Sequence, residues 1–180
     1  MRTLFLLVLL PVAANAANLR FEAGGGFAAE QSPSQVFLVA QGGAGVDFGY
    51  VEPGISLSYF DGGNRGHVTD ERYDGSLQAW SAVALLRFHS AGAHQFVFGL
   101  GAGVGQVKLS EAMGTLVAYR GAVAAATRVE AGYRYSGETL SLGLGLGLHI
   151  FNRVTQSDGP TGSFGAWALV LTIGARVPPF

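Results

Sequence analysis

Histidines are the side chains in this sequence that are best suited to acid–base chemistry near neutral pH. The chain has four of them, at His67, His89, His94 and His149. His89 and His94 flank a short glycine-containing segment, whereas His67 lies in a charged, polar stretch typical of a solvated loop. No serine, histidine and acid set is evident around these histidines, so we do not expect an enzyme.

Metal and cofactor chemistry has little support in the sequence. The chain contains no cysteine, which excludes a disulfide framework and a thiolate metal site. No two histidines have the i, i+2 spacing that places side chains on one face of a strand. Asp70, Glu71 and Asp74 give only a weak suggestion of calcium binding. The glycine-rich tract 99–103 lies within an alternating segment, whereas a phosphate-binding loop would open a helix. We therefore expect no metal and no cofactor.

A further set of polar side chains falls on the less apolar face of segments in which apolar residues alternate with other residues. The set consists of Glu22, Gln41, Asp47, Arg87, Arg128, Glu130, Arg134, His149 and Arg176. Both signs of charge are present, so burial in pairs is feasible, whereas a lone buried charge would be costly. We predict that these side chains form a structural polar network in the interior of the fold. The alternative is that they line a narrow aqueous or ligand-gated path.

The elements that carry this set are predicted to be strands. Leucine or isoleucine occupies every second position from Leu140 to Ile150, and serine, glycine and histidine lie between them. A period of two predicts a strand, and the repeated glycines disfavour a helix. The same alternation occurs at 19–30, 36–48, 80–88, 95–105 and 167–177. In the first of these segments, Arg20, Glu22 and Glu30 share the inward face. A short third strand is expected to begin at Ile55, after a turn at Glu52-Pro53-Gly54.

The segment Tyr119–Tyr135 is rich in alanine and could also form a helix. As a strand, however, it places Arg120, Arg128, Glu130 and Arg134 on a single face. A charge facing lipid near the middle of a membrane costs about 2–4 kcal/mol, and the strand arrangement avoids this cost. We therefore predict a strand, which brings the total to eight. The inward positions of the two flanking segments are largely glycine, at 99–105 and 143–147, and we expect these glycines to leave space for the arginines of this strand.

The composition is that of a membrane protein. Hydrophobic residues make up 49% of the chain and charged residues only 13%, and the mean hydropathy is +0.33. Beyond the first residues, no apolar run reaches the roughly 18 residues that a spanning helix needs. Since only helices and closed barrels satisfy their backbone hydrogen bonds in lipid, the sequence predicts a transmembrane, eight-stranded, antiparallel up-and-down β-barrel.

Other classes of protein fit the sequence less well. A secreted soluble β-sandwich would carry charge on its outer faces, whereas here the outward positions hold leucine, phenylalanine and tryptophan. The net charge of −1 and the lack of a basic stripe argue against nucleic-acid binding.

The first 16 residues have the features of a secretory signal peptide. Arg2 supplies a positive start, residues 4–12 an apolar stretch, and Ala14-Asn15-Ala16 a small-x-small cleavage site. A retained membrane anchor is the alternative. We expect a signal peptide at 1–16 and one barrel domain at 17–180.

The links between strands are expected to differ in length on the two sides of the barrel. Short turns are predicted at 52–54, 90–93 and 136–137, and long polar links at Asp61–Gly75 and Thr155–Ser163. An even number of strands places both ends of the domain on one side, together with the short turns. Aromatic residues near the strand ends suggest two interfacial belts. The belts would consist of Tyr59, Trp80, Tyr119 and Trp167 at the outer rim and Phe88, Phe96, Tyr133 and Tyr135 at the inner rim.

With its export signal, eight alternating segments and terminal Phe180, the chain resembles the small outer-membrane barrels of the OmpA transmembrane domain and OmpX type. The resemblance covers residues 17–180 and rests on the pattern alone. It implies location in the bacterial outer membrane, contact with outer-membrane lipid, and recognition of the C-terminal strand by the barrel-assembly machinery through Phe180. Here Phe180 is in phase with the inward Arg176, and Pro178-Pro179 precedes it, which departs from the usual pattern.

The resemblance also bears on catalysis, because some barrels of this type are lipid-modifying enzymes. A deacylase-like arrangement would have a serine two residues after His149, but Phe151 occupies that position. The function we expect is a structural or surface-interaction role without catalysis, in a protein that is a monomer. The alternatives are a narrow pore for small solutes and, more distantly, a lipid-modifying enzyme.

Overall fold

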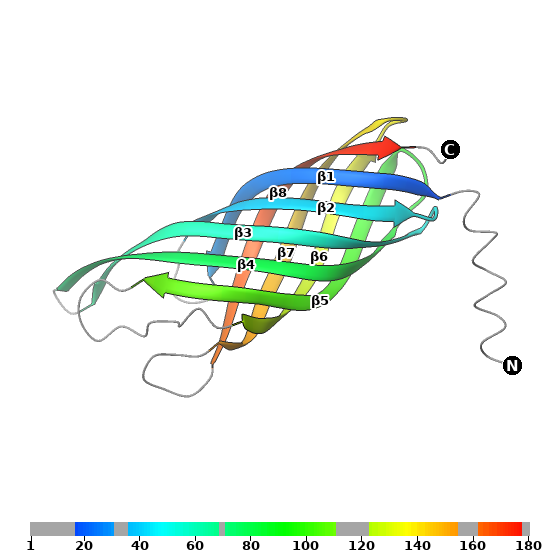
Figure 1. The fold of residues 1–180 in the computed structure, drawn as a ribbon. Coiled ribbons are helices and arrows are strands. Elements are labelled where there is room, and N and C mark those ends of the chain that lie inside the picture. The colour runs from blue at the N-terminus through cyan, green and yellow to red at the C-terminus, as the bar shows by residue number, and fades with distance from the viewer. Residues whose placement is uncertain (1–16, 31–35, 69–70, 111–122, 155–161, 178–180) are drawn as a thin grey trace, which may run out of the picture.

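The structure, a computed structural model, describes residues 17–30, 36–68, 71–110, 123–154 and 162–177 (Figure 1). These residues form eight β-strands. The strands are β1 (Asn18–Glu30), β2 (Val36–Asp47), β3 (Val51–Val68), β4 (Glu71–His89), β5 (His94–Ser110), β6 (Val123–Ser136), β7 (Leu140–Val154) and β8 (Gly162–Val177). Across the described residues, no helix has the length and hydropathy needed to cross a membrane.

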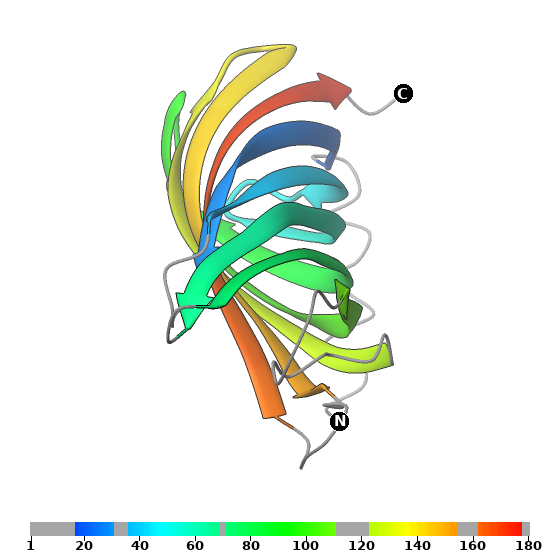
Figure 2. The ribbon, with the colours of Figure 1, turned by 90° about the vertical axis from the view of Figure 1, so that its left-hand side faces the viewer.

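The strands form a closed antiparallel barrel in chain order. Each strand pairs with the next along the chain, and β1 closes the barrel by pairing with β8 from Leu19↔Val177 to Glu30↔Ala166. Figure 2 shows the strands curving around a common axis. The start of β1, the end of β8 and the three short turns lie at one end, which we call the inner end (Figure 1). The predicted fold class is therefore confirmed.

Burial alternates along the strands as the sequence predicts. On β7, the leucines at 140, 142, 144 and 146 are exposed on the outer surface, whereas Ser141 and His149 are buried inside. On β6, Arg128, Glu130 and Arg134 are buried, and Val129, Tyr133 and Tyr135 are exposed. A strand reverses its face at every residue, so one apolar phase covers the outside while the other phase fills the lumen.

Two of the three short turns lie where the sequence predicts them. The β4–β5 turn contains Gly92, whose φ of 91° favours glycine, and β6 ends at Ser136 before the turn to β7. The turn expected at Glu52-Pro53-Gly54 is wrong. β3 begins at Val51, and the chain turns at 48–50, where Gly49 has a φ of 96°.

The physical reason lies in the chemistry at this turn. Asp47 accepts a hydrogen bond from the backbone N–H of Gly49 at 2.8 Å, which stabilises a turn through a side chain. The amide of Phe48 also donates to the carbonyl of Val51 at 2.9 Å. The pairing of β3 with β2 ends at Gly54. Pro53 precedes Gly54 in the chain and lies outside this pairing, so its missing N–H costs no hydrogen bond between these two strands.

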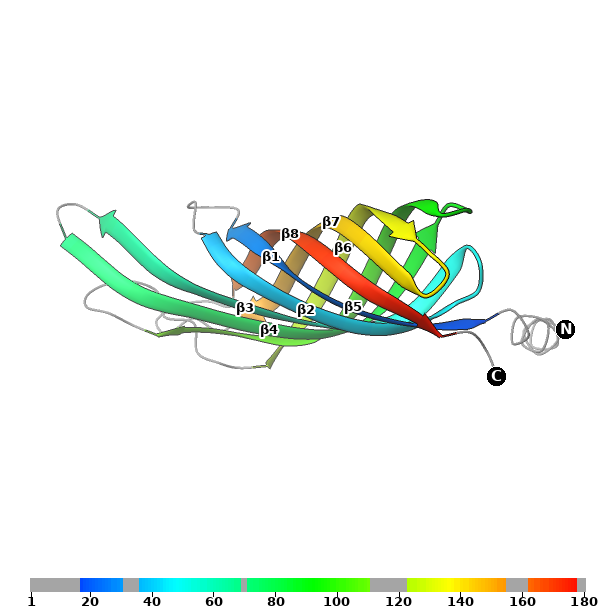
Figure 3. The ribbon, with the colours of Figure 1, turned by 90° about the horizontal axis from the view of Figure 1, so that it is seen from above.

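The long polar link expected at Asp61–Gly75 is also wrong, because most of it is strand. β3 has 18 residues and β4 has 19, and the two pair from Val51↔Phe88 to Val68↔Glu71. The pairing of β2 with β3 ends at Asp61, and that of β5 with β4 ends at Ser76, so the hairpin extends beyond its neighbours (Figure 3). The third strand, predicted to be short, is instead among the longest. A hairpin outside the barrel need not bury an apolar face, so its sequence shows no alternation.

Some sequence predictions lie outside the described residues. They concern the signal peptide at 1–16, Tyr119 and Arg120, Phe180, and most of the link Thr155–Ser163. Glu30, His67 and the acidic residues at 71 and 74 lie in strands, but the structure does not describe their side chains.

Candidate functional site

Two different sets of side chains fill the lumen along its axis, and we call them its two fillings. Toward the inner end it holds charged and polar side chains, which we call the ion network: Arg20, Glu22, Gln41, Asp47, Glu52, Ser56, Ser58, Arg87, His89, Gln95, Arg128, Glu130 and Arg134. Toward the outer end it holds four aromatic rings, which we call the aromatic plug: Phe37, Phe60, Phe151 and Phe164. An eight-stranded barrel is just wide enough for side chains to fill it, so these residues decide what the lumen can do.

Arg87 on β4 contacts carboxylates from three other strands. Its Nε donates to Oε1 of Glu130 at 2.6 Å, and its Nη1 donates to Oε1 of Glu52 at 3.0 Å. Its Nη2 donates to Oε1 of Glu22 on β1. Charge-assisted bonds of this kind are stronger than neutral ones, so Arg87 links β1, β3, β4 and β6 across the lumen.

Glu52 on β3 is the matching acidic centre. Besides Arg87, it accepts from Nη1 of Arg134 at 2.8 Å, and its Oε2 lies 3.5 Å from Nε of Arg20. The Glu52 side chain is only 2% exposed. One buried carboxylate thus serves three arginines, which is the arrangement that makes burial of several charges tolerable.

Arg128 on β6 joins the network to the polar residues of β2 and β3. Its Nη2 donates to Oε1 of Gln41 at 2.9 Å and pairs with Oε2 of Glu130. Its Nη1 donates to the hydroxyl of Ser56 at 2.9 Å and lies within 3.4 Å of that of Ser58. The guanidinium therefore reaches the opposite side of the barrel.

Asp47 contacts side chains from three other strands near the inner end. Its Oδ1 lies 3.2 Å from Nε2 of His89, and its Oδ2 lies 3.6 Å from Nη2 of Arg20 and 3.8 Å from Nη2 of Arg176. Arg20 is on β1 and Arg176 on β8, so Asp47 lies beside both strands of the closing seam. Arg176 is 33% exposed and borders a wide opening of about 680 Å³ at this end.

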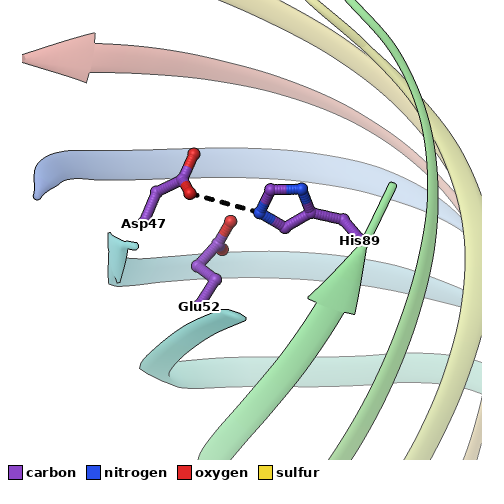
Figure 4. Close-up of side chains that lie close together, drawn as sticks. All are labelled: Asp47, Glu52 and His89. Atoms are coloured by element: carbon purple, nitrogen blue, oxygen red, sulfur yellow. Dashed lines mark hydrogen bonds and ion pairs between the residues drawn. The ribbon is translucent and has the colours of Figure 1, made fainter. Parts of the chain in front are cut away.

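Asp47, Glu52 and His89 are the described residues that come nearest to a metal site. One ligand atom from each lies within 4.8 Å of the others, and Figure 4 shows the three side chains pointing toward one another. Arg20, however, lies within 3.6 Å of both carboxylates, and Arg134 also contacts Glu52. A cation would have to displace these arginines, so the geometry favours an ion-pair cluster over a metal centre.

All nine side chains of the sequence-predicted set point into the lumen. Eight of them are buried or nearly so, in or beside the ion network, and Arg176 lies at its inner margin. His149 is 2% exposed and stacks edge-on against Phe60, with ring centroids 4.9 Å apart, so it lies where the ion network meets the aromatic plug.

Sequence reasoning missed six members of the ion network, and three of these six are ionisable, namely Arg20, Glu52 and His89. Arg20 was expected to face inward but was not assigned to the network. His89 was assigned only to the margin of a turn, and Glu52 was placed in a turn that does not exist. Glu52 has the same parity as Ser56 and Ser58, opposite to Ile55 and Leu57, and extending the strand toward its start would have revealed it.

Inward glycines give the larger side chains their space, although not always the expected ones. A Cβ at Gly99 would lie 2.7 Å from Cγ of Glu130, and one at Gly105 would lie 2.5 Å from Cε1 of Phe151. The glycines of β5 were predicted to make room for the arginines of β6, but they make room for a carboxylate and for an aromatic ring. A Cβ at Gly147 of β7, in contrast, would lie 3.8 Å from Nε of Arg128.

The aromatic plug closes the outer half of the lumen. Its four rings are at most 1% exposed. Phe151 lies 5.8 Å from Phe164 and 6.3 Å from Phe60, and Phe37 lies 6.3 Å from Phe164, measured between ring centroids. Edge-to-face and tilted contacts at these distances are favourable, so the rings form one connected layer. Sequence analysis predicted only a polar interior and missed this layer.

The outer surface of the barrel is apolar. Leucines, valines and phenylalanines are exposed along all eight strands, and Tyr59, Trp80 and Trp167 are exposed toward the outer rim. Phe88, Phe96, Tyr133 and Tyr135 are exposed toward the inner rim. Among the described residues, the charged side chains on the outer surface of the strands are Asp61 and Lys108, both near the outer end.

The sequence matches no family model and no curated protein. Solved structures, however, share its fold. Neisserial surface protein A is 12% identical, with a TM-score of 0.59 over 90% of this chain and 96% of its own. Ail, the attachment invasion locus protein of Yersinia pestis, solved in complex with the heparin analogue sucrose octasulfate, is 14% identical, with a TM-score of 0.52 over 89% and 97%.

The outer membrane enzyme PagL is 13% identical, with a TM-score of 0.50 over 85% of this chain and 97% of its own. The chain therefore has the fold of the small eight-stranded outer-membrane β-barrels, and the resemblance found in the sequence is confirmed at the level of the fold. At these identities the fold alone is shared, and a fold of this kind is compatible with several functions.

Proposed function

We propose that this protein is a bacterial outer-membrane barrel with a structural or surface-interaction role and no catalytic activity. The observation that carries the proposal is the closed lumen inside an apolar outer surface. The aromatic plug and the ion network follow one another along the axis, and both consist of buried side chains. Residues 1–16 would direct export, and the barrel would lie in the outer membrane as a monomer in contact with lipid.

The outer surface supports the membrane location. Contiguous apolar patches on soluble monomers rarely exceed a few hundred Å², whereas here exposed apolar side chains surround the barrel. Every strand within the closed barrel is paired on both edges, so the barrel itself offers no free edge to a second copy. Strand β8, with its outward Trp167, Leu169 and Leu171, would be the strand that the assembly machinery reads, together with Phe180.

The histidines with described side chains support the absence of catalysis. His89 contacts Asp47, His94 contacts the hydroxyl of Tyr133, and His149 lies against Phe60. Within the described part of the chain, none of them is hydrogen-bonded to a serine hydroxyl, which a nucleophilic serine would require.

Planar-bilayer recording of the purified protein, refolded in detergent, tests the closed lumen. A shift in gel migration upon boiling shows that the sample is folded. We expect no discrete conductance steps from the folded form, since ions would have to pass both fillings. Reproducible single-channel steps that disappear after heat unfolding would contradict the proposal and establish the narrow pore.

Mass spectrometry of lipid A tests the absence of catalysis. Lipid A from Gram-negative cells that express the protein should have the same acyl composition as lipid A from cells carrying an empty vector. A defined gain or loss of an acyl chain would contradict the proposal. The Leu146→Arg variant, which places a charge on the outer surface near the middle of β7, controls for effects of overexpression without correct insertion.

A further inference from the structure

A small cavity lies in the lumen between the arginines of β6 and the glycine-lined wall of β7. It has a volume of about 60 Å³. Three nitrogen atoms of its lining side chains have no hydrogen-bond partner among the described residues: Nε of Arg128, Nη2 of Arg134 and Nε2 of His149. All three residues are more than nine-tenths buried. Arginine N–H groups only donate, so two of these atoms can be satisfied only by an acceptor.

Two of the three atoms converge on one point. A Cβ built on Gly147 would lie 3.4 Å from Nε2 of His149 and 3.8 Å from Nε of Arg128. A single acceptor near that point can therefore receive hydrogen bonds from both side chains. Because residue 147 is glycine, no side chain of its own occupies this point.

The wall of the cavity has an excess of positive charge. Three arginines line it, at 87, 128 and 134, against two carboxylates, Glu22 and Glu130. Glu52, which accepts from Arg87 and Arg134, does not line the cavity. Glu52 balances one of these arginines, but over the described charged side chains of the lumen five arginines, with Arg176 at the inner margin, face four carboxylates. This excess of positive charge favours an acceptor that carries one negative charge over a neutral one.

We infer that this cavity is a binding site for a small monovalent inorganic anion of the halide class. Nε of Arg128 and Nε2 of His149 donate to the anion. The anion would also fix His149 in the tautomer that carries its proton on Nε2. This site is independent of the proposed function and needs no opening of the lumen, because the anion can enter while the barrel folds.

The direct test is a crystal structure of the protein refolded in sodium bromide, with anomalous data collected at the bromine edge. We expect an anomalous peak inside the barrel, near Gly147. The inference is overturned if the density there has no anomalous signal and is therefore water, or if bromide is found only on the outer surface as an adventitious ion.

A solution test uses the equilibrium between the folded and unfolded protein in detergent, measured with urea. At ten times its dissociation constant, an anion that binds only the folded state raises the folded-to-unfolded ratio about tenfold. We therefore expect this increase when sodium gluconate, whose anion is too large for the cavity, is replaced by sodium chloride. A wild-type protein with equal stability in the two salts would also overturn the inference.

Gly147→Ala closes the site with one methyl group at ordinary contact distances, so it should fold and lose the response to chloride. Gly42→Ala is the matched control. Its Cβ would approach only the carbonyl oxygen of Glu22, at 3.8 Å, and its position is outside the lumen. This control should keep the tenfold response, and an undiminished response in Gly147→Ala would contradict the inference.

Discussion

At the scale of single residues, Glu52 is the side chain on which most of the ion network depends. It is fully buried and is the acidic partner of Arg20, Arg87 and Arg134. Each of those arginines has other partners, but no other carboxylate pairs with all three of them. Removal of this one charge therefore affects three strands besides its own.

Glu52→Gln should destabilise the folded barrel by about 3–5 kcal/mol, because it leaves buried arginines without their counter-charge. Urea unfolding in detergent, followed by tryptophan fluorescence, measures the change. Glu138→Gln is the control, since Glu138 is exposed in the turn before β7 and should shift the free energy of unfolding by no more than about 0.5 kcal/mol. Equal effects of the two substitutions would show that the network does not stabilise the barrel.

The sequence could reveal which residues face inward but not which partners they have. Parity along a strand placed Arg87, Arg128 and Glu130 on the inner face, and the structure finds them there. The pairing of Arg87 with Glu130 depends on the register between β4, β5 and β6, which parity within one strand does not contain. Glu52 was missed because Pro-Gly is a strong turn signal. This signal outweighed the spacing of two residues that places Glu52, Gly54 and Ser56 on one face of a strand.

At the scale of elements, the outward leucines of β7 make the orientation of that strand testable. Leu146 lies near the middle of the strand and Leu140 at its inner end, and both are exposed on the outer surface. An arginine facing lipid costs about 2–4 kcal/mol at the bilayer midplane and about 0–1 kcal/mol near the interfaces.

Leu146→Arg should therefore lower the free energy of unfolding in phospholipid vesicles by about 2–4 kcal/mol, and Leu140→Arg by no more than about 1 kcal/mol. Urea titration of the refolded protein in vesicles measures both values. Similar small effects at the two positions would mean that the strand does not cross the bilayer at this depth.

The β3–β4 hairpin beyond the barrel gives a second prediction at this scale. Beyond Asp61 and Ser76 its strands pair only with each other. Deletion of residues 65–74 would join Asn64 to Gly75 and leave Gly63 paired with Ser76. Asn-Gly is the favoured pair for a two-residue hairpin turn.

We expect this deletion to leave the free energy of unfolding within about 1 kcal/mol of the wild-type value, since the paired residues that it removes pair only with each other. A loss of the gel shift on boiling would show instead that the hairpin is required for the barrel to fold. The sequence did not reveal this hairpin because residues 61–75 show no hydrophobic period and therefore resemble those of a loop.

At the scale of the whole molecule, the lumen contains two fillings in series, and only one of them was predicted. Phe37, Phe60, Phe151 and Phe164 all have inward parity, but an aromatic residue suits either a lumen or a lipid surface. Alternation shows which residues of a strand share a face, but it does not show whether an apolar face is turned to the lumen or to lipid. The closed ring of eight strands decides this, because it surrounds the four rings with the buried alanines and valines of neighbouring strands.

The two fillings should contribute independently to stability. Phe60 and Glu52 lie on the same strand, eight residues and thus about 26 Å apart. Among the described residues, the ring partners of Phe60 are not the ion-pair partners of Glu52. Phe60→Ala should cost about 3–5 kcal/mol through the cavity that it leaves.

Because distant sites without common partners are additive to within about 0.3–0.5 kcal/mol, the double variant Phe60→Ala/Glu52→Gln should lose the sum of the two single effects. Urea unfolding of the four proteins in one detergent gives the coupling energy directly. Among the described residues, His149 links the two fillings, because it touches Phe60 and lies beside Arg128. A coupling energy above about 1 kcal/mol would mean that the lumen behaves as a single cooperative unit through His149.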